Sequence, residues 1–202
     1  MEKQEKKREP ILMPRLNAVL DYIEKLDFAS RQAKERFKDL DSFCLFVGYP
    51  RSGHSLVGSL LDAHPEVVMA HELNALRCVK AGFSQNMIFE LILRNVQLFN
   101  KKGREWTGYN YKVEGQWQGR YRKLKVIGDK KGGNTSLMLK SKAFQTAVER
   151  IFKVPVKYLH VIRNPYDNIT TMAANSGGDL DFAINRYAEL ANIVVEVKER
   201  GD

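Results

Sequence analysis

Short apolar runs alternate along the chain with longer stretches in which apolar residues recur every three or four positions. The runs are rich in β-branched and aromatic residues, as buried strands are, and they cover residues 43–47, 66–70, 124–128 and 156–162. Strands that alternate with helices pair in parallel through right-handed crossovers. The pattern therefore predicts an α/β fold with three layers, in which helices flank a parallel β-sheet.

The helical stretches lie between these runs and leave one segment undecided. Periodicity predicts one or two amphipathic helices packed on the sheet edge, and then further helices, over residues 12–40, 75–79, 86–99, from Asn134 or Thr135 to about Phe152, and 180–197. Residues 100–123 mix glycine, aromatic, amide and basic residues. That composition suits a binding loop or lid, and it equally suits an irregular hairpin that packs its own tryptophans.

Length and composition indicate one globular domain. A chain of 202 residues, 44% of them hydrophobic, is long enough to bury a sizeable core. We expect a flexible charged tail at residues 1–10 and the domain at 11–202. The charged beginning of the sequence and the lack of an apolar span of membrane length favour a cytoplasmic protein without a membrane partner.

The net charge of +9 is concentrated in one segment. Residues 101–131 carry ten Lys or Arg against three acidic residues, which accounts for +7 of the total. A basic region that faces a cleft attracts an anionic ligand, and a basic face in solvent is the alternative. Because no nucleic-acid-binding motif accompanies the charge, we expect no nucleic-acid partner.

The first run leads into a glycine loop and a helix, which together form a cradle for an anion. Gly48 and Gly53 have the spacing of a phosphate-binding P-loop, with His54 where a nucleoside triphosphatase has its lysine, followed by Ser55. The fixed cation of the loop is Arg51. Free N–H groups and the helix dipole favour a phosphate-type ligand, whereas the missing lysine argues against magnesium–ATP chemistry. A turn without a ligand is the alternative.

The stretch GYPRSGHSLVGSLLDAHP, which begins at Gly48, resembles the 5′-phosphosulfate loop of sulfotransferases that use 3′-phosphoadenosine 5′-phosphosulfate (PAPS). It is most similar to the loop of tyrosylprotein and carbohydrate sulfotransferases. The resemblance implies a P-loop-like fold, PAPS as co-substrate, no metal, and a set of cofactor-binding residues, namely Arg51, Ser52, Gly53, His54 and Ser55. His54 departs from the Thr or Ser of the family, and its imidazole carries charge only near or below its usual pKa of about 6.5.

A second motif follows the last predicted strand. Arg163 begins the run Arg-Asn-Pro-Tyr-Asp, in which Pro165 suits the first turn of a helix, and Thr171 lies eight residues after Arg163. An arginine and a hydroxyl in these positions could bracket one anion. The run resembles the family motif that holds the 3′-phosphate, which implies that Arg163 and Thr171 bind this phosphate, with Thr171 in place of the usual serine.

The resemblance also implies transfer of a sulfuryl group to a hydroxyl or amine of a small-molecule, carbohydrate or peptide acceptor. Counting along the family pattern gives Glu72 as the general base, with the neighbouring His71 as the second candidate. Arg51 suits the leaving phosphate, and Lys130 and Lys131 could neutralise the co-substrate or an acidic acceptor.

Two other functions stay open. The family normally continues with another strand and a closing segment, so we expect a short form of the fold with an exposed sheet edge that favours a homodimer. A short form also suits a non-catalytic binder of 3′-phosphoadenosine nucleotides. A P-loop nucleotide kinase is the remaining alternative, which His54 disfavours.

Overall fold

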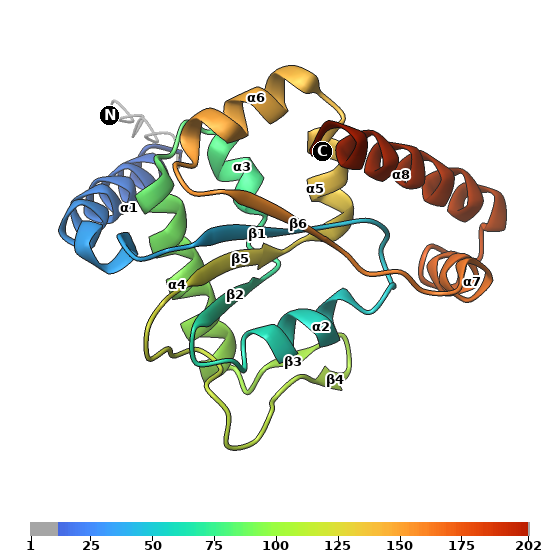
Figure 1. Ribbon diagram of the computed structural model, residues 1–202, viewed down its shortest axis with the longest axis horizontal. Helices are drawn as coiled ribbons and strands as arrows, with labels where there is room; N and C mark the ends of the chain where they lie inside the picture. Colours follow the sequence, from blue (N-terminus) through green and yellow to red (C-terminus); the bar gives the residue numbers. More distant parts are fainter. Residues whose placement is uncertain (1–11, 202) are drawn as a thin grey trace, which may run out of the picture.

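The fold is organised around a parallel sheet of four strands in the order β2-β5-β1-β6 (Figure 1). The structure is a computed structural model that describes residues 12–201, with side chains described from Ala18 to Arg200, so the predicted tail lies outside the described residues. The strands are β1 (Ser42–Val47), β2 (Val67–His71), β5 (Val126–Lys130) and β6 (Val156–His160). The predicted α/β fold is therefore confirmed.

Alternate side chains of β1 enter two different cores, as the twofold repeat of a strand requires. Phe43, Leu45 and Val47 belong to the main core, whereas Cys44 and Phe46 pack in a smaller core on the opposite face of the sheet. Since both faces are covered, the strand reads in the sequence as an uninterrupted apolar run.

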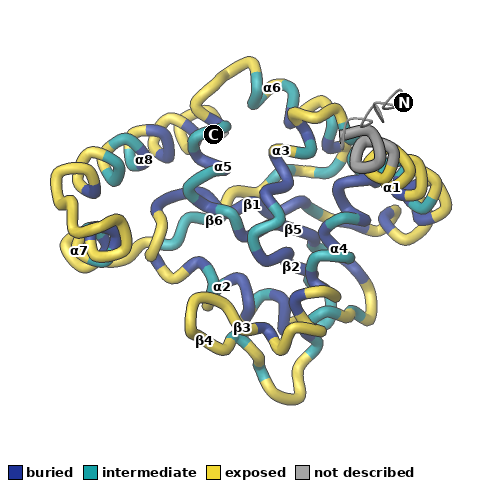
Figure 2. The backbone as a smooth tube through the Cα atoms, turned by 180° about the vertical axis from the view of Figure 1, so that it is seen from behind, coloured by how far each residue is buried: buried dark blue, intermediate teal, exposed yellow. Residues whose placement is uncertain are grey.

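Helices cover both faces of the sheet and make three layers (Figures 1 and 2). One face is covered by α2 (His54–Leu61), which packs Val57 and Leu61 into the smaller core. The main core on the other face takes side chains from α3 (Ala75–Lys80), α4 (Gln85–Lys101), α5 (Gly132–Leu139), α6 (Lys142–Ile151) and α8 (Leu180–Gly201). None of the helices described within residues 12–201 has the length and apolar character needed to cross a membrane.

The remaining helices lie at the two ends of the sheet. The predicted amphipathic helices over residues 12–40 are α1 (Leu12–Gln32) and the short 3-10 helix η1 (Lys34–Phe37), and α1 packs against α4. At the other end, α7 (Pro165–Asn175) packs on α8. Pro165 lies in the first turn of α7 as predicted, and the Asn164 side chain caps the helix by accepting from two backbone N–H groups.

Three expected elements differ in the structure. The fourth strand, predicted over residues 156–162, ends at His160. The single helix predicted to end near Phe152 is two helices, because the chain breaks at Lys140 and Ser141 caps α6 with its hydroxyl. The predicted cap at Asn134 or Thr135 is also wrong, since α5 begins at Gly132. The third strand lies two residues later than predicted, because two polar residues that read as a loop are buried in β5.

The undecided segment 100–123 forms a short hairpin of β3 (Glu105–Trp106) and β4 (Tyr109–Asn110), followed by irregular chain. A buried ion pair fixes its base, in which Arg104 Nη1 lies 2.9 Å from Asp62 Oδ2 and the two side chains are 3% and 0% exposed. Asp62 also accepts the Met69 N–H at 2.9 Å, so one carboxylate joins the end of α2, the strand β2 and the hairpin.

Replacing Arg104 by methionine should destabilise the protein strongly, because it leaves the buried Asp62 carboxylate without its partner. We expect Arg104→Met to lower the free energy of unfolding by about 3–5 kcal/mol in urea titrations. Adding Asp62→Asn should recover part of that loss. Lys112→Met, which removes a solvent-exposed ion pair with Glu114, is the control and should cost under about 1 kcal/mol. Equal losses for the two single variants would contradict this account.

Candidate functional site

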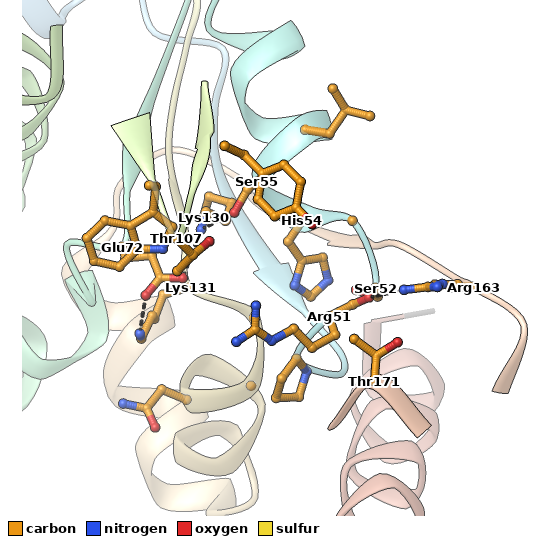
Figure 3. A pocket seen from close by; sticks show the side chains of 18 of the residues that line it. Arg51, Ser52, His54, Ser55, Glu72, Thr107, Lys130, Lys131, Arg163 and Thr171 are labelled. Atoms are coloured by element: carbon orange, nitrogen blue, oxygen red, sulfur yellow. Dashed lines mark hydrogen bonds and ion pairs between the residues drawn. The ribbon is translucent and has the colours of Figure 1, made fainter. Parts of the chain in front are cut away.

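A cavity of about 710 Å³ opens where the parallel strands end (Figure 3). This edge is where open α/β sheets bind ligands. Its walls come from the loop after β1, the turn after β2, the junction of β5 and α5, the hairpin, α7 and α8. The described lining residues include Arg51, Ser52, Gly53, His54, Ser55, Glu72, Lys130, Lys131, Arg163, Thr171 and Arg186.

The loop after β1 adopts a backbone that favours glycine at two of its positions. Gly48 and Gly53 have φ of 114° and 99°. A Cβ at Gly48 would lie 2.6 Å from the His160 ring, so a side chain there would clash as well as strain the backbone. Arg51 has φ of 66°, a conformation that costs a non-glycine residue on the order of 1 kcal/mol or more. Such strain persists because the surrounding structure holds the loop.

Three carbonyl groups of this loop accept hydrogen bonds from the protein. The Asn168 side chain donates to the Pro50 carbonyl at 2.8 Å, and Arg163 Nη1 donates to the Arg51 carbonyl at 3.1 Å. The Ser52 hydroxyl donates to the Tyr49 carbonyl at 3.1 Å.

The backbone N–H groups that follow are free. Within the described part of the chain, the N–H groups of residues 52–55 donate no hydrogen bond, and no side chain caps α2. Because unpaired N–H groups at a helix N-terminus attract anions, this end of the cavity is suited to a phosphate or sulfate group.

The cavity carries a marked excess of positive charge. Its described lining has five cationic side chains, Arg51, Lys130, Lys131, Arg163 and Arg186, against one carboxylate, Glu72. Lys130 is 2% exposed, and its ammonium group lies 2.9 Å from both the Ser55 hydroxyl and a Glu72 oxygen. Lys131 forms a second ion pair with Glu72 (Figure 3). A concentration of charge of this kind draws in anionic ligands.

Glu72 is held as a carboxylate by the two lysines. Burial alone would raise its pKa, but the charges and hydrogen bonds of Lys130 and Lys131 outweigh burial and lower the pKa to about 2. The backbone at Glu72 has φ of 59°. The turn that carries it is fixed by the buried Asp129, whose two carboxylate oxygens accept the Leu73 and Ala75 N–H groups at 3.0 and 2.8 Å.

His54 lies behind the loop and is neutral. Burial, and then the charge of Lys130, lower the pKa of its imidazole to about 4, so it adds no cation to the cavity. Its ring meets Phe46 edge to face, with centroids 5.4 Å apart. In the position where a nucleoside triphosphatase has its lysine, this chain therefore has an uncharged ring, and the nearest comparable ammonium group is that of Lys130 on β5.

The structure brings all but one of the candidate residues to this cavity. Arg51, Ser52, Gly53, His54, Ser55, Glu72, Arg163 and Thr171 all line it. The Thr171 hydroxyl donates to the Asp167 carbonyl of its own helix at 2.6 Å, so its proton must turn away from that carbonyl before it can bind an anion.

His71, the second candidate base, lies outside the described lining. It is buried and stacks on Phe99 with ring centroids 4.1 Å apart, while Trp106 meets it edge to face. Burial lowers the pKa of His71 to about 3. The ring supports the base of the hairpin, and Glu72 is the member of the pair that reaches the cavity.

Arg186 reaches the cavity without having been predicted to do so. It comes from α8, where it also pairs with Glu189 at 2.8 Å. In the sequence, the only pattern of α8 is the periodic repeat of its apolar residues. No local motif distinguishes Arg186 from the other charged residues of the helix. The packing of α8 on α5 and α7 brings it to the site.

Comparison of the chain with protein-family models and with curated proteins finds no match.

Because the His54 imidazole is buried, we expect the protein to lose stability in mild acid. The pKa of His54 is about 4 in the folded protein against 6.5 for the free side chain, so the unfolded chain binds the proton more readily and stability falls as the pH drops from about 6.5 toward 4. Between pH 7 and pH 5 this residue should cost about 1–2 kcal/mol of unfolding free energy. Urea titrations at the two pH values measure it.

The variant His54→Gln should reduce that pH dependence by a similar amount. Identical pH dependence in the wild type and in His54→Gln would contradict the assignment of a buried, neutral His54.

Proposed function

We propose that the protein is a sulfotransferase that moves the sulfuryl group of PAPS to a hydroxyl or amine acceptor. The observation that carries this proposal is the meeting of two anion-binding elements at one cavity. Arg163 donates to the Arg51 carbonyl across 112 positions of sequence, so the glycine loop and the beginning of α7 are neighbours. Two separate cationic positions at one cavity suit a ligand that carries two separate anionic groups.

The described residues fit such a co-substrate at both ends. The free N–H groups of residues 52–55, together with Lys130, suit the phosphosulfate. Arg163, together with the Thr171 hydroxyl once its proton turns from the Asp167 carbonyl to the ligand, suits the 3′-phosphate. These are the roles that the resemblance of the two motifs implies for the same residues.

The reaction needs positioning and charge stabilisation more than covalent help from the protein. The acceptor oxygen forms a bond to sulfur while the bond from sulfur to the bridging phosphate oxygen breaks, and the electron pair leaves with 3′-phosphoadenosine 5′-phosphate. Negative charge therefore grows on the 5′-phosphate. Lys130 and the N–H groups of the loop are placed to stabilise it, as the corresponding groups do in phosphoryl transfer.

The acceptor proton would pass to Glu72, the carboxylate in the cavity lining. With a pKa of about 2, Glu72 is ionised but is a weak base. The lysines that lower its pKa are the same groups that an anionic co-substrate attracts. A ligand that draws Lys130 and Lys131 away from Glu72 would raise the pKa of the carboxylate and make it a stronger base in the bound state.

The double ion pair of Glu72 is also the observation that favours a second candidate function. If Lys130 and Lys131 stay on Glu72 in the bound state, the cavity has a cradle for the nucleotide but no effective base. The protein would then be a non-catalytic binder of 3′-phosphoadenosine nucleotides.

A transfer assay separates the two functions. Wild-type protein with sulfur-labelled PAPS and three acceptors, a phenol, an uncharged sugar and a tyrosine peptide, should label at least one of them. Glu72→Gln should lower kcat by about 10²–10⁴-fold, the usual contribution of a general base, while binding of adenosine 3′,5′-bisphosphate persists. The matched control is Glu105→Gln, at an exposed carboxylate in the hairpin. Undiminished transfer in Glu72→Gln would remove Glu72 as the base, and binding without transfer in the wild type would favour the non-catalytic function.

A further inference from the structure

A second hollow, which we call the side groove, adjoins the candidate site between α2 and the hairpin. It has a volume of about 320 Å³, and its lining includes Leu56, Ser59, Leu60, Tyr109, Tyr111 and Val113. Leu56, Tyr109 and Tyr111 also line the main cavity, so the two hollows adjoin at these three residues.

The side groove contains large apolar side chains that are exposed to solvent. Leu56 and Leu60 are 58% and 54% exposed and lie four residues apart, hence on one face of α2. Tyr109 beside them is 65% exposed. Burying a leucine side chain gains roughly 1.5–3 kcal/mol, so a contiguous exposed group of this kind is typical of a binding surface.

Two polar side chains of the side groove are paired within the fold. The Lys112 ammonium pairs with Glu114 at 2.8 Å, and the Asn110 side chain accepts the Lys112 N–H at 2.8 Å. The Ser59 hydroxyl is buried and has no hydrogen-bond partner within the described residues, and the hydroxyls of Tyr109 and Tyr111 have no side-chain or backbone partner there either.

A mainly apolar hollow with a few hydrogen-bonding groups is the usual form of a site for a small, largely apolar ligand. A sugar, by contrast, would leave the hydroxyl groups that face Leu56, Leu60 and Val113 unpaired. At about 30 Å³ for each water-sized group, the volume holds an apolar body of roughly ten heavy atoms.

We infer that the side groove is the acceptor site and that the acceptor is an uncharged phenol or alcohol with an aromatic or aliphatic body. The inference rests on the proposed function, since it makes the hydroxyl beside Glu72 the group that receives the sulfuryl. The acceptor oxygen lies at the junction of the two hollows, and its apolar body packs on Leu56, Leu60 and Tyr109. This selects against carbohydrate acceptors.

The affinity for 2-naphthol, measured by equilibrium dialysis in the absence of nucleotide, tests the proposed acceptor site directly. Leu60 is the residue to change because it lines the side groove and not the main cavity. We expect Leu60→Gln to weaken 2-naphthol about five- to tenfold, because the ligand would cover the exposed half of a leucine side chain. Leu98→Gln is the matched control, at a leucine that is 57% exposed in the last turn of α4 and lines neither hollow. Methyl β-glucoside should bind more weakly than 2-naphthol.

Unchanged 2-naphthol affinity in Leu60→Gln, or tighter binding of the glucoside than of 2-naphthol, would overturn the inference. Calorimetry with adenosine 3′,5′-bisphosphate on the same variants separates this failure from failure of the proposed function. If wild type and Leu60→Gln bind the bisphosphate equally well and also bind 2-naphthol equally well, the assignment of the groove as the acceptor site is refuted and the proposed function is not. A protein that binds 2-naphthol through Leu60 but no bisphosphate would keep the groove and refute the sulfotransferase.

Discussion

Repulsion among the cations at the carboxyl end of the sheet is the constraint on which the site depends. Five cationic side chains line one cavity, and one of them, Lys130, is almost fully buried. A buried ammonium group needs a partner, and Glu72 supplies it in the structure. The carboxylate proposed as the base therefore also stabilises the ligand-free protein. An anionic ligand would take over that partnership and release Glu72, which couples ligand binding to the activation of the base.

Two further buried carboxylates shape the walls of the cavity without reaching it. Asp129 accepts backbone N–H groups from the turn after β2 and so sets the strained backbone of Glu72. Asp62 pairs with Arg104 and fixes the hairpin that carries the aromatic wall. Both are fully buried, at the end of β5 and just after α2. The two lysines and the glutamate of the site therefore extend from positions next to the core.

The sequence predicted the parts of the molecule that depend on local pattern. The apolar runs of β1 and β2, the glycine loop, and the helix that begins at Pro165 all follow from neighbouring residues, and the structure has them. It did not predict the break at Ser141, because both halves of that stretch keep helical periodicity. Asp129 and Lys130 read as a loop because charged residues are rarely buried in a strand.

For the site, too, the sequence predicted the residues that belong to local motifs and missed those that depend on the packing of distant elements. The two motifs gave the loop residues, Arg163 and Thr171, all of which line the cavity. The family pattern ranked Glu72 above its neighbour His71. No pattern in the sequence showed that the end of β2 directs His71 into the hairpin contact and Glu72 into the cavity. Arg186 and the side groove depend on how distant elements pack, for which a single sequence carries no signal.

The most direct test of the central claim is calorimetric titration with adenosine 3′,5′-bisphosphate, ADP and magnesium–ATP. The account predicts that the bisphosphate binds in the low micromolar range without metal and more tightly than the other two. Arg163→Ala should weaken it by roughly 10–100-fold, since a hydrogen bond to a charged group contributes about 1.5–3 kcal/mol, whereas Arg150→Ala, at an exposed arginine on α6, should not. Equal or tighter binding of magnesium–ATP, or bisphosphate binding that is indifferent to Arg163, would contradict it.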